Sequence, residues 1–141
     1  MFDRPFHAYQ VGERWQSGTR TITETDLMLF SSLSGDWNPL HTDREWAAKS
    51  PFGQRIAHGL LVLSVATGLM RLKPEIVVAF YGIDGVRFVA PTYIGDTLRV
   101  TLEVRALEEK SKGGVITCWM NIAKQSGEAV VLCQIKTLVA K

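Results

Sequence analysis

Hydrophobic and polar residues alternate along the second half of the chain. Between Thr97 and Arg105 the alternation is unbroken, which is typical of a strand with one buried and one solvated face. Residues 124–128 are polar and predict a hairpin loop. Similar patterns predict further strands at residues 12–21, 115–123 and 129–139, and a short one at 86–89. An antiparallel meander is therefore expected after Pro74.

A helix is predicted between Thr23 and Gly35. Its first residues, Thr23–Asp26, have the Ser/Thr-x-x-acid form of a capping box, and Leu27 and Phe30 follow at helical spacing. Gly35 is expected to end this helix, because glycine is the residue most often found just beyond a helix C-terminus.

A second, short helix is predicted to follow. Thr42–Glu45 repeats the helix-start pattern, and Pro51 cannot continue a helix. Trp46 and Ala47 would lie on the apolar side of this helix.

The segment from His58 to Leu72 is apolar on nearly every face. A membrane span needs about 20 apolar residues, and this run is closed by Arg71 and Lys73. It is therefore interpreted as a helix buried inside the domain. Small residues would let the helix lie close against a sheet, namely Ser64, Ala66, Thr67 and Gly68.

Helices in the first half and an antiparallel meander in the second predict an α+β fold. The 141 residues are expected to form one domain, 1–141, and the 46% hydrophobic residues are enough for a core without disulfides or a metal. Intrinsic disorder is excluded by the same composition.

The charge balance removes several classes of partner. Sixteen basic and fourteen acidic residues give a net charge of +2 without a basic cluster, so neither nucleic acid nor an anionic membrane is expected to bind. Cys118 and Cys133 lie inside apolar alternating segments, which predicts core residues and neither a disulfide framework nor a zinc site. The chain start lacks the pattern of a secretory signal, so a cytoplasmic location is expected.

The polar residues that could do chemistry gather between Ser34 and His41. Pro39 restricts the backbone of Asn38, so Asp36 and His41 are expected on a shaped loop where both side chains turn into one space. A carboxylate with an ordinary pKa of about 3.9 beside an imidazole with a pKa of about 6.5 can share a water and exchange its protons near neutral pH.

A second polar group stands at the mouth of the apolar helix. The N–H of Gly59 would be free at the helix start, where the dipole favours negative charge, and could hold a developing oxyanion. Packing alone could also require this glycine. His58 is expected to be structural, with its ring hydrogen-bonded.

These residues carry a resemblance to a known family. Residues 30–41, FSSLSGDWNPLH, together with Ala47, match the signature of the MaoC-like, or hydratase 2, family of hot-dog-fold proteins. Two further stretches resemble family landmarks, FGQRIAHG at 52–59 and VRFVAP at 86–91 followed by GDTL at 95–98. The resemblance extends from about Gly12 to Val139.

The resemblance implies a curved antiparallel sheet wrapped around a long central helix. It also implies that two subunits join their sheets in a homodimer or a dimer of dimers, with the acyl-thioester site at the interface. The implied reaction is the reversible hydration of a trans-2-enoyl thioester to an (R)-3-hydroxyacyl thioester, carried by coenzyme A or an acyl carrier protein. No metal or redox cofactor is implied, and coenzyme A enters only as part of the substrate.

The same resemblance assigns roles to particular residues. Asp36 and His41 would hold the water, the Gly59 amide would bind the thioester oxygen, and Asn38 would orient the loop or the water. Family members carry a serine nine residues after the histidine of the His-Gly pair, where this chain has Thr67. The added methyl group puts that role in doubt, and Ser64 is its rival.

Two other functions fit the same scaffold. Hot-dog folds also support thioester hydrolysis, because a fold does not determine a reaction. A non-catalytic acyl-thioester-binding protein would keep the pocket, although the intact Asp36 and His41 pair argues against it.

Overall fold

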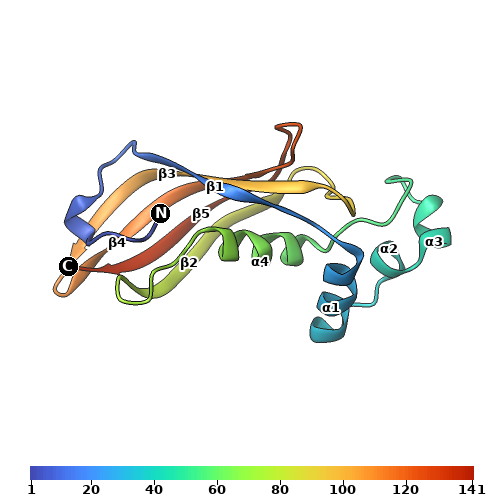
Figure 1. Cartoon of the computed structure of the whole chain (residues 1–141), viewed down its shortest axis with the longest axis horizontal. Coiled ribbons are helices and arrows are strands. Elements are labelled where there is room, and N and C mark those ends of the chain that lie inside the picture. The colour runs from blue at the N-terminus through green and yellow to red at the C-terminus, as the bar shows by residue number, and fades with distance from the viewer.

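The computed structural model describes all 141 residues, and its largest element is one five-stranded antiparallel sheet. The strands lie in the order β1-β3-β4-β5-β2, so β1 and β2 are the two edges (Figure 1). Their bounds are β1 Arg14–Thr21, β2 Val77–Phe88, β3 Thr97–Lys110, β4 Gly113–Ala123 and β5 Ala129–Ala140. The predicted meander of the last three strands and the α+β class are confirmed.

The helices cover one side and one end of this sheet. The curved sheet arches over α4, while α1, α2 and α3 gather beyond one end of it (Figure 1). Their bounds are α1 Glu24–Ser34, α2 Pro39–Thr42, α3 Arg44–Ala48 and α4 Gly59–Leu69, with a short 3₁₀ helix, η1, at Phe6–Ala8. None of them combines the length and hydrophobicity that a membrane crossing requires.

The core lies between the inner face of the sheet and α4. The alternation of β3 puts Leu98, Val100, Leu102 and Val104 fully inside, as the sequence pattern predicts. Burying a side chain of this size typically contributes about 1.5–3 kcal/mol, so these rows hold the sheet against the helix. Neighbouring strands complete the layer with Ile116, Cys118, Met120, Ile122, Cys133 and Ile135.

The start and end of α1 are formed as predicted. The Thr23 hydroxyl accepts a hydrogen bond from the Asp26 N–H, and the Asp26 carboxylate accepts one from the Thr23 N–H. Gly35 ends the helix with φ of 78°, a left-handed conformation that glycine adopts without a Cβ clash. Leu27 and Ser31 are the residues that α1 buries.

Two expectations about secondary structure are wrong. A strand was expected only at 86–89, but β2 begins at Val77, and Asp43 rather than Thr42 caps α3. The first nine residues of β2 do not alternate because the strand is an exposed edge whose pairing with β5 shifts register three times. Trp46 does not pack on an apolar side, since it is 50% exposed while Ala47 is buried.

The prediction that the apolar helix is buried inside the domain is also wrong for one side of it in the single chain. Helix α4 buries Leu61, Val62, Leu63 and Ala66, but Leu60 is 61% exposed. Of its small residues, only Ala66 lies against the core, while Ser64 and Gly68 are exposed. The helix therefore has an apolar face that nothing in this chain covers.

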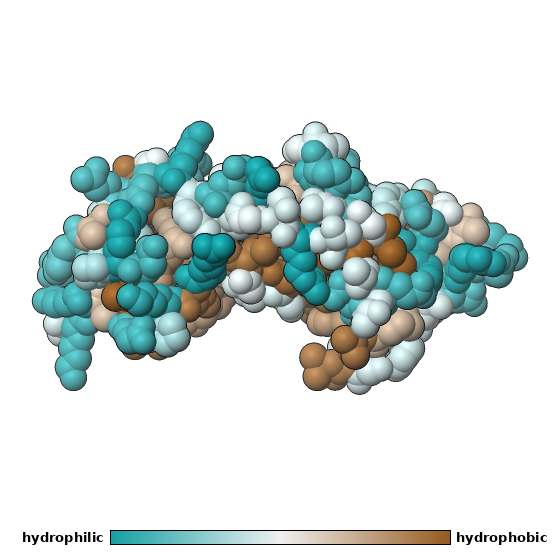
Figure 2. Space-filling view, viewed as in Figure 1, coloured by the Kyte–Doolittle hydropathy of each residue, from teal (hydrophilic) through white to brown (hydrophobic).

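Further hydrophobic side chains reach the surface near this open face. Figure 2 shows them over α1 and along the middle of the molecule. On α1, Leu29 and Leu33 are exposed, and on the unpaired edge β2 the exposed residues are Val78, Phe80, Tyr81 and Phe88. Exposed apolar residues in such number usually mark an interaction surface.

Candidate active site

A cavity of about 290 Å³ opens where the N-terminal end of α4 meets α2 and the end of β2. Most of its wall is apolar, with Phe30, Leu60 and Phe88 among the lining residues. Its polar side chains are Asp36, His41, His58 and Thr92, and Gly59 also lines it. A mainly apolar cavity with a few convergent polar groups is the usual form of a small-molecule site.

Local turn chemistry brings Asp36 and His41 to this cavity. Asp36 lies in the loop after α1, and Asn38 caps α2 by accepting a hydrogen bond from the Leu40 N–H at 2.9 Å. Pro39 occupies the first position of α2, where a missing N–H costs nothing. His41 is thus on a one-turn helix and not on a loop as expected, although the two side chains meet as predicted.

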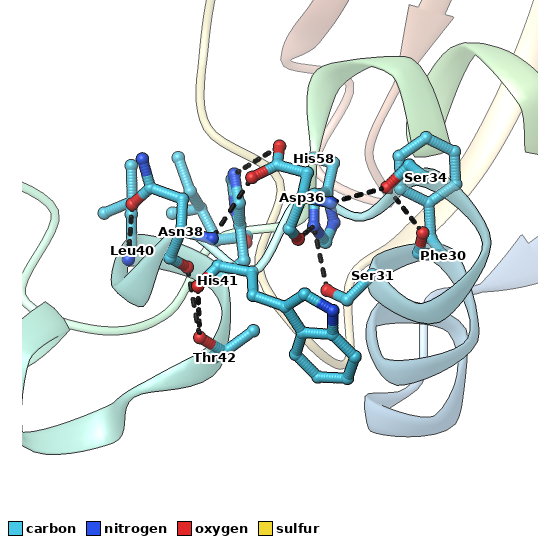
Figure 3. A network of polar contacts seen from close by, with 11 residues as sticks. Phe30, Ser31, Ser34, Asp36, Asn38, Leu40, His41, Thr42 and His58 are labelled. Atoms are coloured by element: carbon cyan, nitrogen blue, oxygen red, sulfur yellow. Dashed lines mark hydrogen bonds and ion pairs between the residues drawn. The ribbon is translucent and has the colours of Figure 1, made fainter.

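The Asp36 carboxylate is held at one oxygen and free at the other. Oδ1 of Asp36 accepts a hydrogen bond from the Asn38 N–H at 3.1 Å. The main-chain N–H of Asp36 donates to the Ser34 hydroxyl at 3.1 Å (Figure 3). Its Oδ2 lies 3.9 Å from Nε2 of His41. About half of the Asp36 side chain remains exposed, so solvent reaches the carboxylate.

The hydrogen bond from His41 to the Ile56 carbonyl oxygen determines the tautomer of the His41 ring. Nδ1 lies 2.8 Å from the carbonyl oxygen of Ile56, which can only accept a hydrogen bond. Nδ1 therefore carries the proton in the neutral ring, and Nε2 is unprotonated. At 3.9 Å the Nε2 and Oδ2 atoms are too far apart for a direct hydrogen bond, but one water can donate to both.

His58 lies behind this pair, directly before α4, and is buried. Its Nε2 lies 3.1 Å from the Asp36 carbonyl oxygen and 3.1 Å from the Ser31 hydroxyl (Figure 3). Its ring stacks on that of His41 with centroids 3.9 Å apart. Burial lowers the pKa of His58 below its usual value, and the neighbouring His41 acts in the same direction.

Gly59 follows His58 as the first residue of α4. Its N–H has no acceptor within the helix, because the first amides of a helix have no carbonyl before them. A Cβ at this position would lie 2.5 Å from the ring of Phe88, so the close approach of that ring requires glycine. The structure thus supports the packing role and places Gly59 on the cavity wall as well.

Thr67 and Ser64 are not brought to this cavity within the single chain. Thr67 donates its hydroxyl hydrogen bond to the Ser64 carbonyl at 2.7 Å, and Ser64 donates to the Leu60 carbonyl at 2.7 Å. Ser64 lines a separate groove of about 530 Å³ between α1 and α4. Both hydroxyls are therefore satisfied on their own helix and lie away from Asp36.

Three groups of the site have the chemistry of metal ligands. Asp36, His41 and His58 each offer one ligand atom, and these atoms lie within 4.8 Å of one another. A metal ion would have to lie in the planes of both imidazole rings, whereas the rings are stacked with an angle of only 28° between their planes. This arrangement suits proton transfer better than metal binding.

Sequence reasoning did not identify two groups that shape the site. The Ile56 carbonyl fixes the tautomer of His41, but a main-chain oxygen carries no sequence signal. Ser31 contacts His58, and its place one turn before Gly35 on the buried side of α1 could have suggested a buried polar contact.

A curved sheet over a helix, with an Asp–His pair and a free amide at one cavity, is the arrangement expected of a hot-dog protein. The family model described as "MaoC like domain" matches residues 8–119. The chain therefore belongs to the MaoC-like dehydratase family.

Individual relatives agree with this assignment. The chain is 32% identical over 137 residues to "3-hydroxyacyl-thioester dehydratase Z" of Mycobacterium tuberculosis, covering 94% of this chain and 91% of that protein. It is 31% identical over 135 residues to an "(R)-specific enoyl-CoA hydratase" of Rhodospirillum rubrum, covering 92% and 94%. A match to "Protein MaoC" of Klebsiella aerogenes is 39% identical over 104 residues, and these cover 72% of this chain but 30% of that protein.

Solved structures show the same fold. An Archaeoglobus protein described as a monoamine oxidase regulatory protein superposes with a TM-score of 0.90 at 39% identity, covering 100% of this chain and 98% of that one. A Mycobacterium tuberculosis protein described as having a double hot-dog fold has a TM-score of 0.85 at 22% identity over 97% of this chain and 44% of its own. The predicted hot-dog fold is confirmed.

Proposed function

We propose that this protein reversibly hydrates trans-2-enoyl thioesters to (R)-3-hydroxyacyl thioesters. The observation that carries the proposal is the pair of unprotonated acceptors, His41 Nε2 and Asp36 Oδ2, which face each other 3.9 Å apart at the cavity. The names of the two relatives above, a dehydratase and an (R)-specific hydratase, describe the two directions of this reaction.

The proposed reaction begins with a water held between His41 and Asp36. A water between His41 and Asp36 donates one hydrogen to each, which leaves a lone pair of its oxygen directed away from both and toward a bound acyl group. As this oxygen bonds to C3 of the enoyl group, one of its protons passes to the pair. Electron density moves from the C2–C3 double bond toward the thioester oxygen, and the pair then returns a proton to C2.

The free N–H of Gly59 stabilises the charge on the thioester oxygen during this step. Such a donor at a developing oxyanion is worth about 3–4 kcal/mol of transition-state stabilisation. Asn38 supports the reaction indirectly, because its side chain caps α2 and its N–H holds one oxygen of Asp36. Thr67 and Ser64 lie on the open side of α4, where they are proposed to face the acyl chain or a second subunit.

A homodimer, or a dimer of dimers, is part of the proposal. Strand β2 is an unpaired edge that exposes several large hydrophobic residues, and the uncovered side of α4 adds Leu60. A second copy of the chain placed against this edge would extend the sheet and cover those side chains. Phe88 lies on this edge and also lines the cavity, so the second subunit would lie beside the acyl group.

The substrate is proposed to be an acyl thioester of coenzyme A or of an acyl carrier protein, without a separate cofactor. A cytoplasmic location stays part of the proposal, supported by two free buried cysteines. Assaying matched enoyl thioesters of both carriers, at acyl lengths from C4 upward, identifies the preferred carrier and chain length.

The decisive test follows the ultraviolet absorbance of crotonyl-CoA, which falls as the conjugated double bond is hydrated. Asp36→Asn and His41→Gln should each lower kcat by about 10²–10⁴-fold, because each removes a proton acceptor. Asp43→Asn is the matched control, since Asp43 caps α3 outside the cavity and asparagine caps equally well. Full activity in both site variants would overturn the proposal.

Two other outcomes identify the alternatives. Release of free thiol from acyl-CoA without hydration would make the protein a thioesterase. Saturable binding of the thioester without conversion would make it an acyl-thioester-binding protein.

A further inference from the structure

We propose that His58 is the positioning residue of this site and that it holds Asp36 in place through the main chain. The expected effect on kcat rests on the proposed hydration, whereas the hydrogen bond that positions Asp36 is observed in the structure. Nε2 of His58 lies 3.1 Å from the Asp36 carbonyl oxygen, across 22 residues of sequence.

The hydrogen bond to Asp36 determines the tautomer of His58. A carbonyl oxygen cannot donate, so the proton must be on Nε2 of the histidine. The Ser31 hydroxyl, 3.1 Å from the same nitrogen, lies close enough to share this proton. Nδ1 is then the unprotonated nitrogen, and it is buried without a hydrogen-bond partner. In the Nδ1–H form, the lone pair of Nε2 would instead face the Asp36 carbonyl oxygen, which cannot donate to it.

This bond is the only hydrogen bond that ties Asp36 to a distant part of the chain. Its other hydrogen bonds, to Ser34 and Asn38, reach only two residues along the same loop. Those local bonds shape the turn but do not place it relative to α4. His58 does so, because it immediately precedes α4 and Gly59.

The same imidazole supports His41 from behind. The two rings stack at 3.9 Å, and Phe30 contacts His58 with ring centroids 4.9 Å apart. Two protonated imidazoles at this distance would repel each other, and the charged groups that face His58 are only His41 and Asp36. A neutral His58 leaves His41 free to take a proton during turnover. His41 also has its own anchor at Ile56, so the main dependence on His58 lies with Asp36.

A matched pair of amide variants tests this role. In His58→Gln the side-chain nitrogen reaches the place of Nε2 and can still donate to the Asp36 carbonyl. In His58→Asn the amide ends near the place of Nδ1 and cannot reach it. The Gln variant should keep kcat near the wild-type value, whereas the Asn variant should lose about 10- to 100-fold in kcat, as expected for a misplaced reacting group. KM should change little in either.

Equal kcat in the Gln and Asn variants would overturn the inference. Thermal unfolding of both proteins separates this effect from loss of the fold. A second measurement needs neither a variant nor activity, since proton–nitrogen NMR correlation spectra of the wild-type imidazoles report the tautomer of each neutral ring. His58 should show the Nε2–H form at pH 7. An Nδ1–H form or an imidazolium would refute the inference, whether or not the protein hydrates enoyl thioesters.

Discussion

Substituting Gly59 by alanine tests whether its amide faces the reacting oxygen. The new Cβ would lie 2.5 Å from the Phe88 ring, about 1 Å closer than ordinary van der Waals contact. Phe88 is 52% exposed in the single chain, so no buried neighbour within this chain prevents its ring from moving away from the new Cβ. The backbone of Gly59 has no left-handed conformation that alanine would resist.

The expected stability change is small because two effects oppose each other. Crowding typically costs about 1–3 kcal/mol, and the low end applies where the neighbour can move. Alanine gains up to about 1 kcal/mol over glycine in a helix. The net change should stay within about 1 kcal/mol, which shifts the melting temperature of a domain this size by roughly 2–4 °C.

The expected change in rate is much larger. The methyl group would crowd the space in front of the Gly59 N–H, and losing such a donor lowers kcat by about 10²–10³-fold. The assay is crotonyl-CoA hydration beside thermal unfolding. Gly18→Ala is the control, because Gly18 lies on β1 away from the cavity and from the open side of α4, has open space for a Cβ and should keep wild-type kcat. A Gly59→Ala protein that folds and keeps wild-type kcat would refute the oxyanion role.

Three further predictions concern stability and assembly. Gly114→Ala would drive a Cβ into the ring of the buried Phe6, which cannot swing away, so urea titration should show a loss of about 1–3 kcal/mol in the free energy of unfolding; an unchanged midpoint would contradict this packing. Burial keeps the pKa of His58 below its unfolded value of about 6.5, so the unfolded chain binds more protons than the folded chain. The free energy of unfolding should therefore fall as the pH drops from about 7 through the lowered pKa. Urea titrations at successive pH values should show this fall, and His58→Gln should flatten it. Tyr81→Glu, at a residue 62% exposed on β2, should leave the chain folded but shift sedimentation from dimer to monomer, and an unaltered sedimentation coefficient would place the interface elsewhere.

The sequence predicts those parts of the fold that depend on local chemistry. The capping box at Thr23, the left-handed Gly35 and the alternation of β3 are formed as expected, because each is decided by neighbouring residues. Trp46 was misplaced because α3 is so short that its apolar residues do not define a face.

The extent of β2 and the open face of α4 could not be predicted in the same way. The three register shifts between β2 and β5 interrupt the two-residue period of this strand, and Gly82 and Gly85 further weaken the pattern. The apolar face of α4 looks like core in sequence because the residues that bury a surface need not come from the same chain.

In the site, too, contacts set by local sequence could be predicted and contacts set by packing could not. The meeting of Asp36 and His41 follows from the turn around Pro39, which local sequence specifies. The tether from His58 to Asp36 is a side-chain contact with a main-chain oxygen 22 residues away, and such contacts depend on how α1 and α4 pack. No pattern of residue types could distinguish that arrangement from a histidine that merely fills the core.

The position of His58 between the loop and α4 has a consequence for regioselectivity. His58 bonds the main chain of Asp36 on one side and is followed by Gly59 on the other, so the distance between the Asp36 carboxylate and the Gly59 amide depends on this one residue. Under the proposed hydration, a thioester whose carbonyl oxygen binds at Gly59 would present to the water only the carbon a fixed number of bonds away. An isomer with its double bond one carbon further along the acyl chain would occupy the cavity as an inhibitor, because its reactive carbon lies beyond the reach of the water.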